Sequence, residues 1–360
     1  MRVQVAPALI ALLLPLTASA CDSGPAVPDG AAPWVTKASD DELAEVADGI
    51  GDDDALALAR VAGAPGIVRT PDGATLLTWS ESGTEGEWSA SAWIAFSPDG
   101  EITGSRSSRQ FNPASPVAYD GGFLAAGPLD LDLPSPLLIS ESGKVGTPPA
   151  PLARPRPARP GDLVLGGLGG DAFRPSDGTL APLPEAEKGI EGSLMPTALD
   201  GSGALTVLSG TVRRPVLNHS ADGGATWERK EIELPPGLTI VADDLFAGQH
   251  RTLLPLQDSK SQVAGWITRS TGDAAWTVTS FDPVIEDAQV LGLVGERVLV
   301  APFDDSAGML ISLDDTDDRI EVDRKELRAS GGKVYSMSPK VTESADGKTW
   351  TDVPLQFPKD

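Results

Sequence analysis

The sequence predicts an all-β chain that folds as a β-propeller of seven four-stranded blades, with six or eight blades as the alternatives. Two observations lead to this fold class. From residue 65 onward, short runs rich in Val, Ile, Leu, Thr and Trp alternate with Gly, Asp, Ser and Pro, and helical periodicity is almost absent. Turn sequences also recur about every 41 residues, which is the length of one propeller blade.

The recurring turns are Asp-Gly or Ser-Gly corners, each between two strand-like runs. They are placed at Gly100, Gly143, Gly178, Gly223, Gly272, Asp315 and Gly347. Seven corners predict seven blades. A Pro-rich stretch over residues 148–160 interrupts the array, and because proline lacks a backbone N–H, we expect an extended connection between blades there. A ligand for a peptide-recognition domain is the alternative for this stretch.

The N-terminus predicts export. The apolar run from Val5 to Ala20 is too short to span a bilayer of roughly 30 Å permanently, so residues 1–20 are interpreted as a signal peptide. Ala18, Ser19 and Ala20 before Cys21 resemble the lipobox of bacterial lipoproteins, with Ala18 where that family usually has Leu. The resemblance implies that Cys21 carries a lipid and anchors the chain to the extracytoplasmic face of the bacterial cell membrane. An ordinary cleavage site is the alternative.

The remaining chain divides into three parts. Residues 21–38 are rich in Pro, Gly, Ala and Asp and predict a flexible tether. Residues 39–62 predict a short helical segment, because acidic residues at 40–42 precede an apolar spacing of Leu43, Val46 and Ile50. Residues 63–360 form the predicted propeller. Cys21 is the only cysteine, so no disulfide can stabilise this fold.

Two corners carry a fuller motif. The first spans residues 220–227 and the second residues 344–350, and their defining residues are Ser220, Asp222, Gly224, Thr226, Trp227, Ser344, Asp346, Gly347, Thr349 and Trp350. The Asp accepts backbone N–H groups in a turn, Gly allows positive φ, and Thr and Trp open the next strand. The motif resembles the Asp-box of the sialidase-like, or BNR-repeat, propellers. That resemblance implies a structural role on the outside of the propeller.

The same resemblance sets the alternative activity. A sialidase needs three arginines on one carboxylate, a tyrosine activated by a neighbouring glutamate, and an acid or base aspartate. Residues Gly66–Gly73, followed by Thr75–Glu81, look like the opening hairpin of that family. Arg60 and Tyr335 are the candidates for the substrate arginine and the nucleophile. Their motifs are incomplete, which favours a protein without catalytic activity over an exo-acting glycosidase of the sialidase type.

Charge and composition narrow the partners. Acidic residues outnumber basic ones by 52 to 28, and the resulting net charge of −24 disfavours binding to nucleic acid. His219 and His250 are the only histidines, and they stand without the spacing of a metal site, so neither a metal nor a cofactor is predicted. We expect a monomer that contacts the membrane only through its lipid and binds an unidentified protein or glycan.

Overall fold

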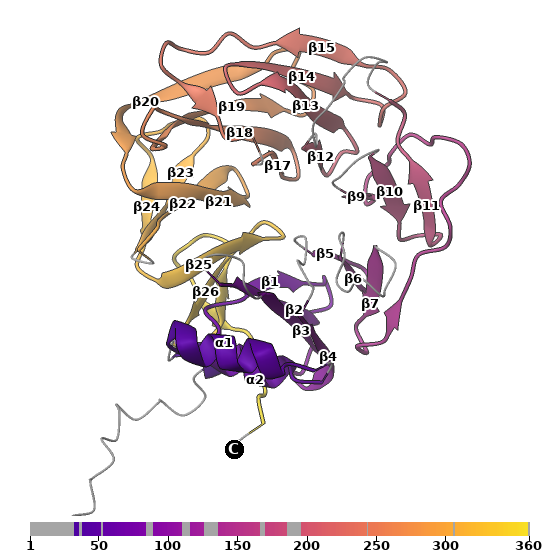
Figure 1. The fold of residues 1–360 in the computed structure, drawn as a ribbon. Coiled ribbons are helices and arrows are strands. Elements are labelled where there is room, and N and C mark those ends of the chain that lie inside the picture. Colours follow the sequence, from indigo (N-terminus) through magenta and orange to yellow (C-terminus); the bar gives the residue numbers. More distant parts are fainter. Residues whose placement is uncertain are drawn as a thin grey trace, which may run out of the picture.

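The computed structural model describes residues 32–35, 38–51, 53–83, 89–109, 116–125, 136–165, 170–185, 196–242, 244–304 and 307–358. Within these ranges the chain forms seven antiparallel sheets, each built from strands that are consecutive in sequence. The sheets follow one another around a ring (Figure 1). The predicted all-β propeller with seven blades is therefore confirmed. Cys21, the predicted signal peptide and most of the predicted tether lie outside the described residues.

The blades are numbered in chain order. Blade 1 contains β1 (Gly66–Arg69), β2 (Thr75–Ser82), β3 (Ser89–Phe96) and β4 (Ile102–Ser108), and blade 2 contains β5 (Val117–Tyr119), β6 (Gly122–Ala125), β7 (Leu137–Ser140) and β8 (Val145–Gly146). Blade 3 contains β9 (Leu163–Leu165), β10 (Asp171–Arg174) and β11 (Thr179–Pro182), and blade 4 contains β12 (Thr197–Leu199), β13 (Leu205–Thr211), β14 (Arg214–Ser220) and β15 (Glu228–Glu231).

Blade 5 contains β16 (Thr239–Ile240), β17 (Phe246–Ala247), β18 (Arg251–Gln257), β19 (Val263–Ser270) and β20 (Thr277–Ile285). Blade 6 contains β21 (Ala288–Val294), β22 (Arg297–Pro302), β23 (Gly308–Ser312) and β24 (Arg319–Val322). Blade 7 contains β25 (Lys325–Ser330), β26 (Lys333–Ser338), β27 (Thr342–Ser344) and β28 (Thr351–Asp352).

Two blades depart from the predicted four strands. Among the described residues, blade 3 has three strands, and its free edge is occupied by the Pro-rich segment: the N–H of Leu152 donates to Leu180 O at 2.8 Å and that of Arg156 to Pro182 O at 2.9 Å. Intervening prolines have no N–H to extend this ladder. In blade 5 the short strands β16 and β17 both pair with β18, which gives five strands.

The predicted corners are all confirmed. Each of the seven lies between the last two strands of one blade. At Gly223, φ is +70° and a Cβ would stand 2.1 Å from the carbonyl oxygen of Ala158, in the segment that precedes blade 3. At Gly100, φ is +85° and a Cβ would stand 2.6 Å from Pro354 after blade 7. These two corners therefore need glycine both for the turn and for contact with a neighbouring segment.

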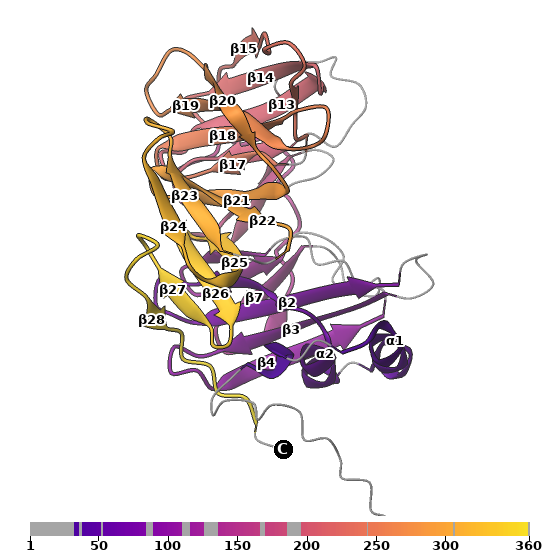
Figure 2. The same cartoon turned by 90° about the vertical axis from the view of Figure 1, so that its left-hand side faces the viewer.

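The predicted short helix is present and ends at Gly49, and a second helix that was not predicted follows it. After a 3-10 turn, η1 (Pro33–Val35), come α1 (Asp40–Gly49) and α2 (Ala55–Val61). Ser39 caps α1 in a capping box with Glu42. The residues between the helices include Gly51, which interrupts the helical run. Both helices lie beside blade 1, where α2 packs on β3 (Figure 2). None of the described helices is long and apolar enough to span a bilayer.

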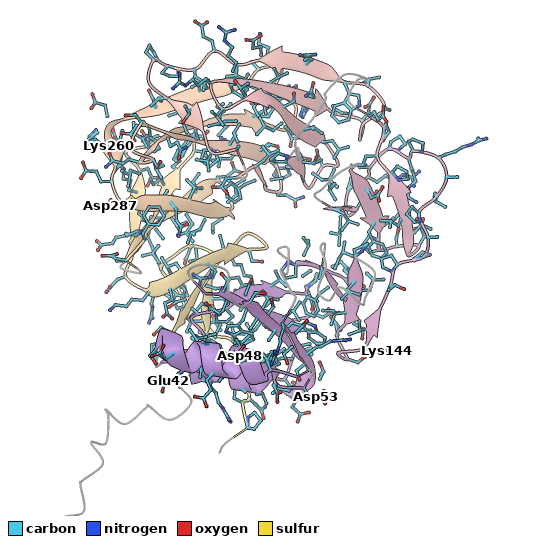
Figure 3. All side chains as sticks on the ribbon, in the orientation of Figure 1. Glu42, Asp48, Asp53, Lys144, Lys260 and Asp287 are labelled. Carbon is cyan, nitrogen blue, oxygen red and sulfur yellow. The ribbon has the colours of Figure 1, made fainter. Side chains whose placement is uncertain are left out.

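Apolar side chains fill the spaces between neighbouring blades. Trp93 of blade 1 packs with Phe123 of blade 2, and Trp266 of blade 5 belongs to the same apolar cluster as Val298 of blade 6. Figure 3 shows labelled acidic residues such as Asp48 and Asp287 at the outer rim. The ring is therefore held by interblade apolar packing, as expected for a chain whose sheets exchange no strands.

Candidate binding pocket

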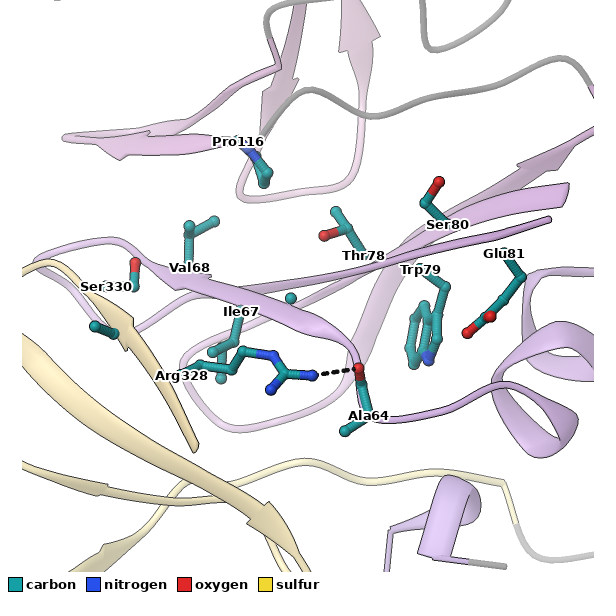
Figure 4. Close-up of a pocket in the computed structure, with 12 residues that line it drawn as sticks. Ala64, Ile67, Val68, Thr78, Trp79, Ser80, Glu81, Pro116, Arg328 and Ser330 are labelled. Atoms are coloured by element: carbon teal, nitrogen blue, oxygen red, sulfur yellow. Dashed lines mark hydrogen bonds between the residues drawn. The ribbon is translucent and has the colours of Figure 1, made fainter. Parts of the chain in front are cut away.

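A pocket of about 380 Å³ opens where blades 1, 7 and 2 approach one another (Figure 4). It lies at the seam, which we define as the junction between β1 of the first blade and β25 of the last. Its lining comprises Ala64, Gly66, Ile67, Val68, Thr78, Trp79, Ser80, Glu81, Pro116, Arg328, Ala329 and Ser330. Apolar residues of β1 form much of the surface, and polar groups come from β2 and β25.

Arg328 contributes the positive charge. It stands on β25, half-buried, and its guanidinium donates through Nη2 to the carbonyl of Ala64 and through Nη1 to that of Leu327, both at 2.9 Å. The bond to Ala64 crosses the seam, because Ala64 leads into β1 (Figure 4). A guanidinium is always charged and attracts anions and other hydrogen-bond acceptors, even though both terminal nitrogens of Arg328 already donate to backbone carbonyls. This side of the pocket therefore favours an anionic or hydroxyl-rich group.

Residues on β2 supply the opposite charge and the hydroxyl groups. The backbone of Gly63 fixes the side chains of Trp79 and Glu81 on this strand. Its carbonyl accepts from Trp79 Nε1 at 3.1 Å, and its N–H donates to Glu81 Oε1 at 3.2 Å. Because side chains alternate along a strand, Thr78 and Ser80 point to the other side, toward Pro116 (Figure 4). The pocket thus offers a cation, an anion and hydroxyl groups along one apolar wall.

Tyr335, the predicted nucleophile of the alternative reading, is buried between blades 7 and 1. It is only 2% exposed and is paired across the sheet with Arg328 on one side and Glu343 on the other. Burial, followed by the charge of Glu343, raises its pKa well above the ordinary value. A tyrosine nucleophile needs a pKa shift in the other direction. Tyr335 is absent from the pocket lining.

Glu343 connects this tyrosine to two cations. Arg69 Nη1 lies 2.7 Å from Glu343 Oε2, and Lys333 Nζ donates to Oε1 at 2.9 Å. Burial alone would raise the pKa of Glu343, but the hydrogen bonds and charges of Arg69 and Lys333 outweigh it and lower that pKa. Arg69 is on β1 and the other two are in blade 7, so this ion pair also spans the seam.

Arg60, the other candidate of the alternative reading, lies elsewhere. It is exposed near the end of α2, a helix that packs on β3 and β4. Like Tyr335, it is absent from the pocket lining. The structure therefore does not bring the two candidates together at the described pocket, and the residues that do meet there are Arg328, Glu81 and their hydroxyl neighbours.

The first Asp-box-like corner, residues 220–227, forms a closed hydrogen-bond network. Asp222 accepts from the Thr226 N–H and from its hydroxyl at 2.7 Å each, and from the Ser220 hydroxyl at 2.8 Å. The N–H of Gly224 donates to Ser220 Oγ at 2.6 Å. These bonds, led by those of Thr226, lower the pKa of Asp222 to about 2. Trp227 is half-buried and packs against the apolar cluster between blades 3 and 4, which includes Ala172 and Leu205.

The second Asp-box-like corner, residues 344–350, repeats this network in blade 7. Asp346 accepts from the N–H groups of Lys348 and Thr349 at 2.8 Å each, and Ser344 accepts from the N–H of Gly347 at the same distance. The backbone bond from Thr349 is the leading cause that lowers the pKa of Asp346. Trp350 is half-buried, with the guanidinium of Arg324 5.3 Å from its ring centroid. Both aspartates therefore accept backbone N–H groups at their corners.

Sequence reasoning missed a third tryptophan corner and the residues of the pocket. Trp276 precedes β20 as Trp227 precedes β15, and it packs edge-on against His219 of blade 4 with ring centroids 6.2 Å apart. The available signal was the sequence spacing from Ser270 to Trp276, which equals the spacing from Ser344 to Trp350 in the second motif. Arg328 could have been paired with Tyr335 from the Gly331-Gly332 turn. That Ala64 lies beside Arg328 has no local signal, because 264 residues separate them.

No protein-family model matches this chain, and no curated protein does. The chain is similar to the solved β-propeller domain of the trilobed protease from Pyrococcus furiosus, with a TM-score of 0.47 and 8% identity over 81% of this chain and 96% of that one. It is similar to a streptogramin B lyase, with a TM-score of 0.45 and 14% identity over 78% and 93%. It is also similar to the NanB sialidase from Streptococcus pneumoniae, with a TM-score of 0.36 and 11% identity over 82% and 66%. At such identities the similarity concerns the β-propeller fold alone.

Proposed function

We propose that this protein is a membrane-anchored, extracytoplasmic β-propeller that acts as a non-catalytic protein- or glycan-binding module. The observation that carries the proposal is the pocket at the seam, where Arg328 and Glu81 stand with hydroxyl groups along an apolar wall. Ligand sites combine apolar lining with a few placed polar groups, and volumes of about 300–1,000 Å³ are usual. The pocket would take one sugar unit or one polar side chain of a larger partner.

The anchor is part of the proposal. Lipidation of Cys21 would hold a monomer at the outer face of the bacterial cell membrane, and the acidic surface would keep nucleic acid away. Mass spectrometry of the mature N-terminus tests this step. A diacylglycerol-modified Cys21 supports it, as does release of the protein from membranes by Cys21→Ala. A mature N-terminus that is unmodified and lies at a residue other than Cys21 contradicts the anchor. The proposal of a ligand site at the pocket is then tested on its own.

A panel of glycans and peptides tests the pocket. We expect a ligand whose binding, measured by calorimetry, is abolished by Ser80→Arg, because the larger side chain would fill the pocket from an exposed strand position. Ser82→Arg is the matched control, since Ser82 is exposed on the same strand and lies outside the lining. Retention of binding in Ser80→Arg would exclude the pocket. If no glycan or peptide of the panel binds and no partner is purified from solubilised membranes, the proposal of a binding module is contradicted.

The alternative function is an exo-acting glycosidase of the sialidase type. One observation favours it: Tyr335, Glu343 and Arg69 are neighbours, and such an enzyme pairs a tyrosine with a glutamate. It predicts hydrolysis of a fluorogenic sialoside that Arg60→Ala or Tyr335→Phe abolishes. The binding module predicts no hydrolysis at any pH from 4 to 9. Because Tyr335 is buried and its pKa is raised, the binding module is the better supported of the two.

A further inference from the structure

The seam differs from the other six junctions of the ring. Blade 1 consists of the first four strands and blade 7 of the last four, so no described strand is shared between them. The chain itself connects every other pair of neighbouring blades. Among the described residues, side chains and the segments at 32–35 and 353–357 hold the two blades together at the seam, and the candidate pocket is at this same junction.

Both ends of the described chain cross the seam. At the N-terminal end, the Ala32 N–H donates to Pro339 O and Trp34 Nε1 to Met337 O, each at 2.9 Å, and both acceptors belong to blade 7. The chain then continues through α1 and α2 onto blade 1 (Figure 2). We call residues 32–35 the N-terminal strap. It connects the outer part of blade 7 to the helices that cover blade 1.

The C-terminal end crosses in the same place. After β28, the N–H of Gln356 donates to Gly100 O at 2.8 Å and its Nε2 to Asp99 O at 3.0 Å, both in the last corner of blade 1. The Phe357 ring packs edge-on against Phe96 at 5.2 Å and against Trp34 at 5.6 Å between ring centroids. We call residues 353–357 the C-terminal strap. The two straps therefore meet at one aromatic contact.

A continuous path leads from that contact to the pocket. Trp34 packs edge-on against Trp79 at 5.7 Å, and Trp79 lines the pocket. Trp79 Nε1 donates to Gly63 O, and the next residue, Ala64, accepts from Arg328. Every step is a direct contact between packed or hydrogen-bonded groups. Phe357 thus reaches Arg328 through Trp34, Trp79 and the Gly63–Ala64 backbone without touching the pocket.

We infer that Phe357 is a positioning residue for the pocket: by holding the two straps together it keeps the seam closed and sets the distance between β1 and β25. The inference rests on the proposed function only in treating the pocket as the ligand site. Loss of Phe357 would loosen the one junction without a chain connection, and the other six would stay packed. Ligand affinity at the pocket is then coupled to the C-terminal end of the chain.

A thiol introduced into the pocket tests the inference without any ligand. Cys21→Ser removes the only native thiol, and Ser330→Cys then places a single one in the pocket lining. We expect Phe357→Ala to raise the rate of its labelling by iodoacetamide roughly fivefold, which corresponds to losing an aromatic pair. Phe357→Tyr keeps the ring and should restore the slow rate. An unchanged rate in Phe357→Ala would overturn the inference.

Two controls separate positioning from general loss of stability. Phe281→Ala removes another edge-on aromatic contact, against Trp266 in blade 5, and should leave the labelling rate of the pocket thiol unchanged. A half-buried thiol from Ser209→Cys in blade 4 should be insensitive to Phe357→Ala. Equal acceleration at both thiols would also overturn the inference. If labelling responds as expected but no glycan or peptide binds, the proposed function fails while the coupling at the seam stands.

Discussion

One aspartate in each of the two Asp-box-like corners accepts several hydrogen bonds from backbone and hydroxyl donors although its side chain is exposed. The pKa of Asp222 is about 2, compared with an ordinary 3.8, so between these values the folded chain binds fewer protons than the unfolded chain. Its stabilising contribution is therefore complete above the unfolded pKa and is lost as the pH falls toward the folded one. The same direction holds for Glu343, whose pKa is also lowered.

This linkage gives a prediction for Asp222→Asn. The variant should unfold at a lower urea concentration than the wild type at neutral pH, and the gap should shrink as the pH falls from 4 to 2.5, because protonation removes the same charge from the wild type. Urea midpoints at several pH values measure it. Asp72→Asn, in the exposed turn between β1 and β2, is the control and should show little gap. A gap that does not vary with pH would contradict the account.

A buried ion pair gives a second residue-scale prediction. Arg174 donates to Asp162 through Nε at 2.8 Å and Nη2 at 2.7 Å, and both side chains are less than 10% exposed. Arg174→Met leaves a buried carboxylate without its cation and should cost about 3 kcal/mol of unfolding free energy. Adding Asp162→Leu should recover part of the loss, because no buried charge remains. Denaturant titrations of both variants measure the free energy of unfolding. A loss below about 1 kcal/mol in Arg174→Met would refute the prediction.

At the scale of elements, the last corner of a blade is a contact surface as well as a turn. The corner at Gly223 approaches the segment before blade 3, and that at Gly100 approaches the chain after blade 7. The corner at Gly143 approaches β4 of the preceding blade, where a Cβ would stand 2.4 Å from Thr103 O. Corners thus join neighbouring segments at the periphery, in addition to the apolar packing between sheets.

A pair of glycine variants isolates this contact. Gly223 and Gly272 occupy equivalent corners with φ of +70° and +87°, but a Cβ at Gly272 would meet nothing within 4 Å. Gly272→Ala should cost about 1 kcal/mol through backbone strain alone. Gly223→Ala should cost about 2 kcal/mol or more, because it adds a steric clash. Thermal unfolding of both variants compares them, and equal losses would show that the contact contributes nothing.

The sequence indicated these corners well because turn chemistry is local. Asp, Ser and Gly encode each corner within a few residues, and all seven are where the pattern predicts. Strand counts were less accessible. A proline-rich segment gives no strand pattern although its N–H groups at Leu152 and Arg156 pair with β11, and β16 has only two residues. The first helix ends at Gly49, where glycine predicts an end, but the second helix over Ala55–Val61 has too few residues to give a clear helical pattern.

At the scale of the molecule, a ring of blades was predicted, but the contacts that close it could not be. The straps are short, and apolar residues such as Trp34 and Phe357 have no periodic neighbours that would place them. The pocket depends on that closure, since Arg328 meets Ala64 only when the last blade reaches the first. The Asp-box resemblance indicated the propeller without locating the pocket, because the boxes are at the corners and their residues do not line it.

Closure by the straps predicts tolerance to circular permutation. The ends are adjacent at the Trp34–Phe357 contact, and each blade uses only consecutive strands. A chain in which a Gly-rich linker joins residue 358 to residue 32, with new ends between Pro236 and Gly237, should keep its melting temperature within about 5 °C. Circular dichroism measures this. Opening within β18, between Leu254 and Pro255, is the control and should prevent folding. Failure of the first permutant would contradict closure by the straps.

The Pro-rich segment along β11 has a consequence for the protein in a crowded environment. An uncovered sheet edge offers a row of backbone groups on which a second molecule can add a strand, and this is a common start of aggregation. Here the edge carbonyls of Leu180 and Pro182 are already taken, and prolines at 151, 155 and 157 leave the covering segment with few donors of its own. This edge of the thinnest blade is thereby closed to intermolecular strand addition.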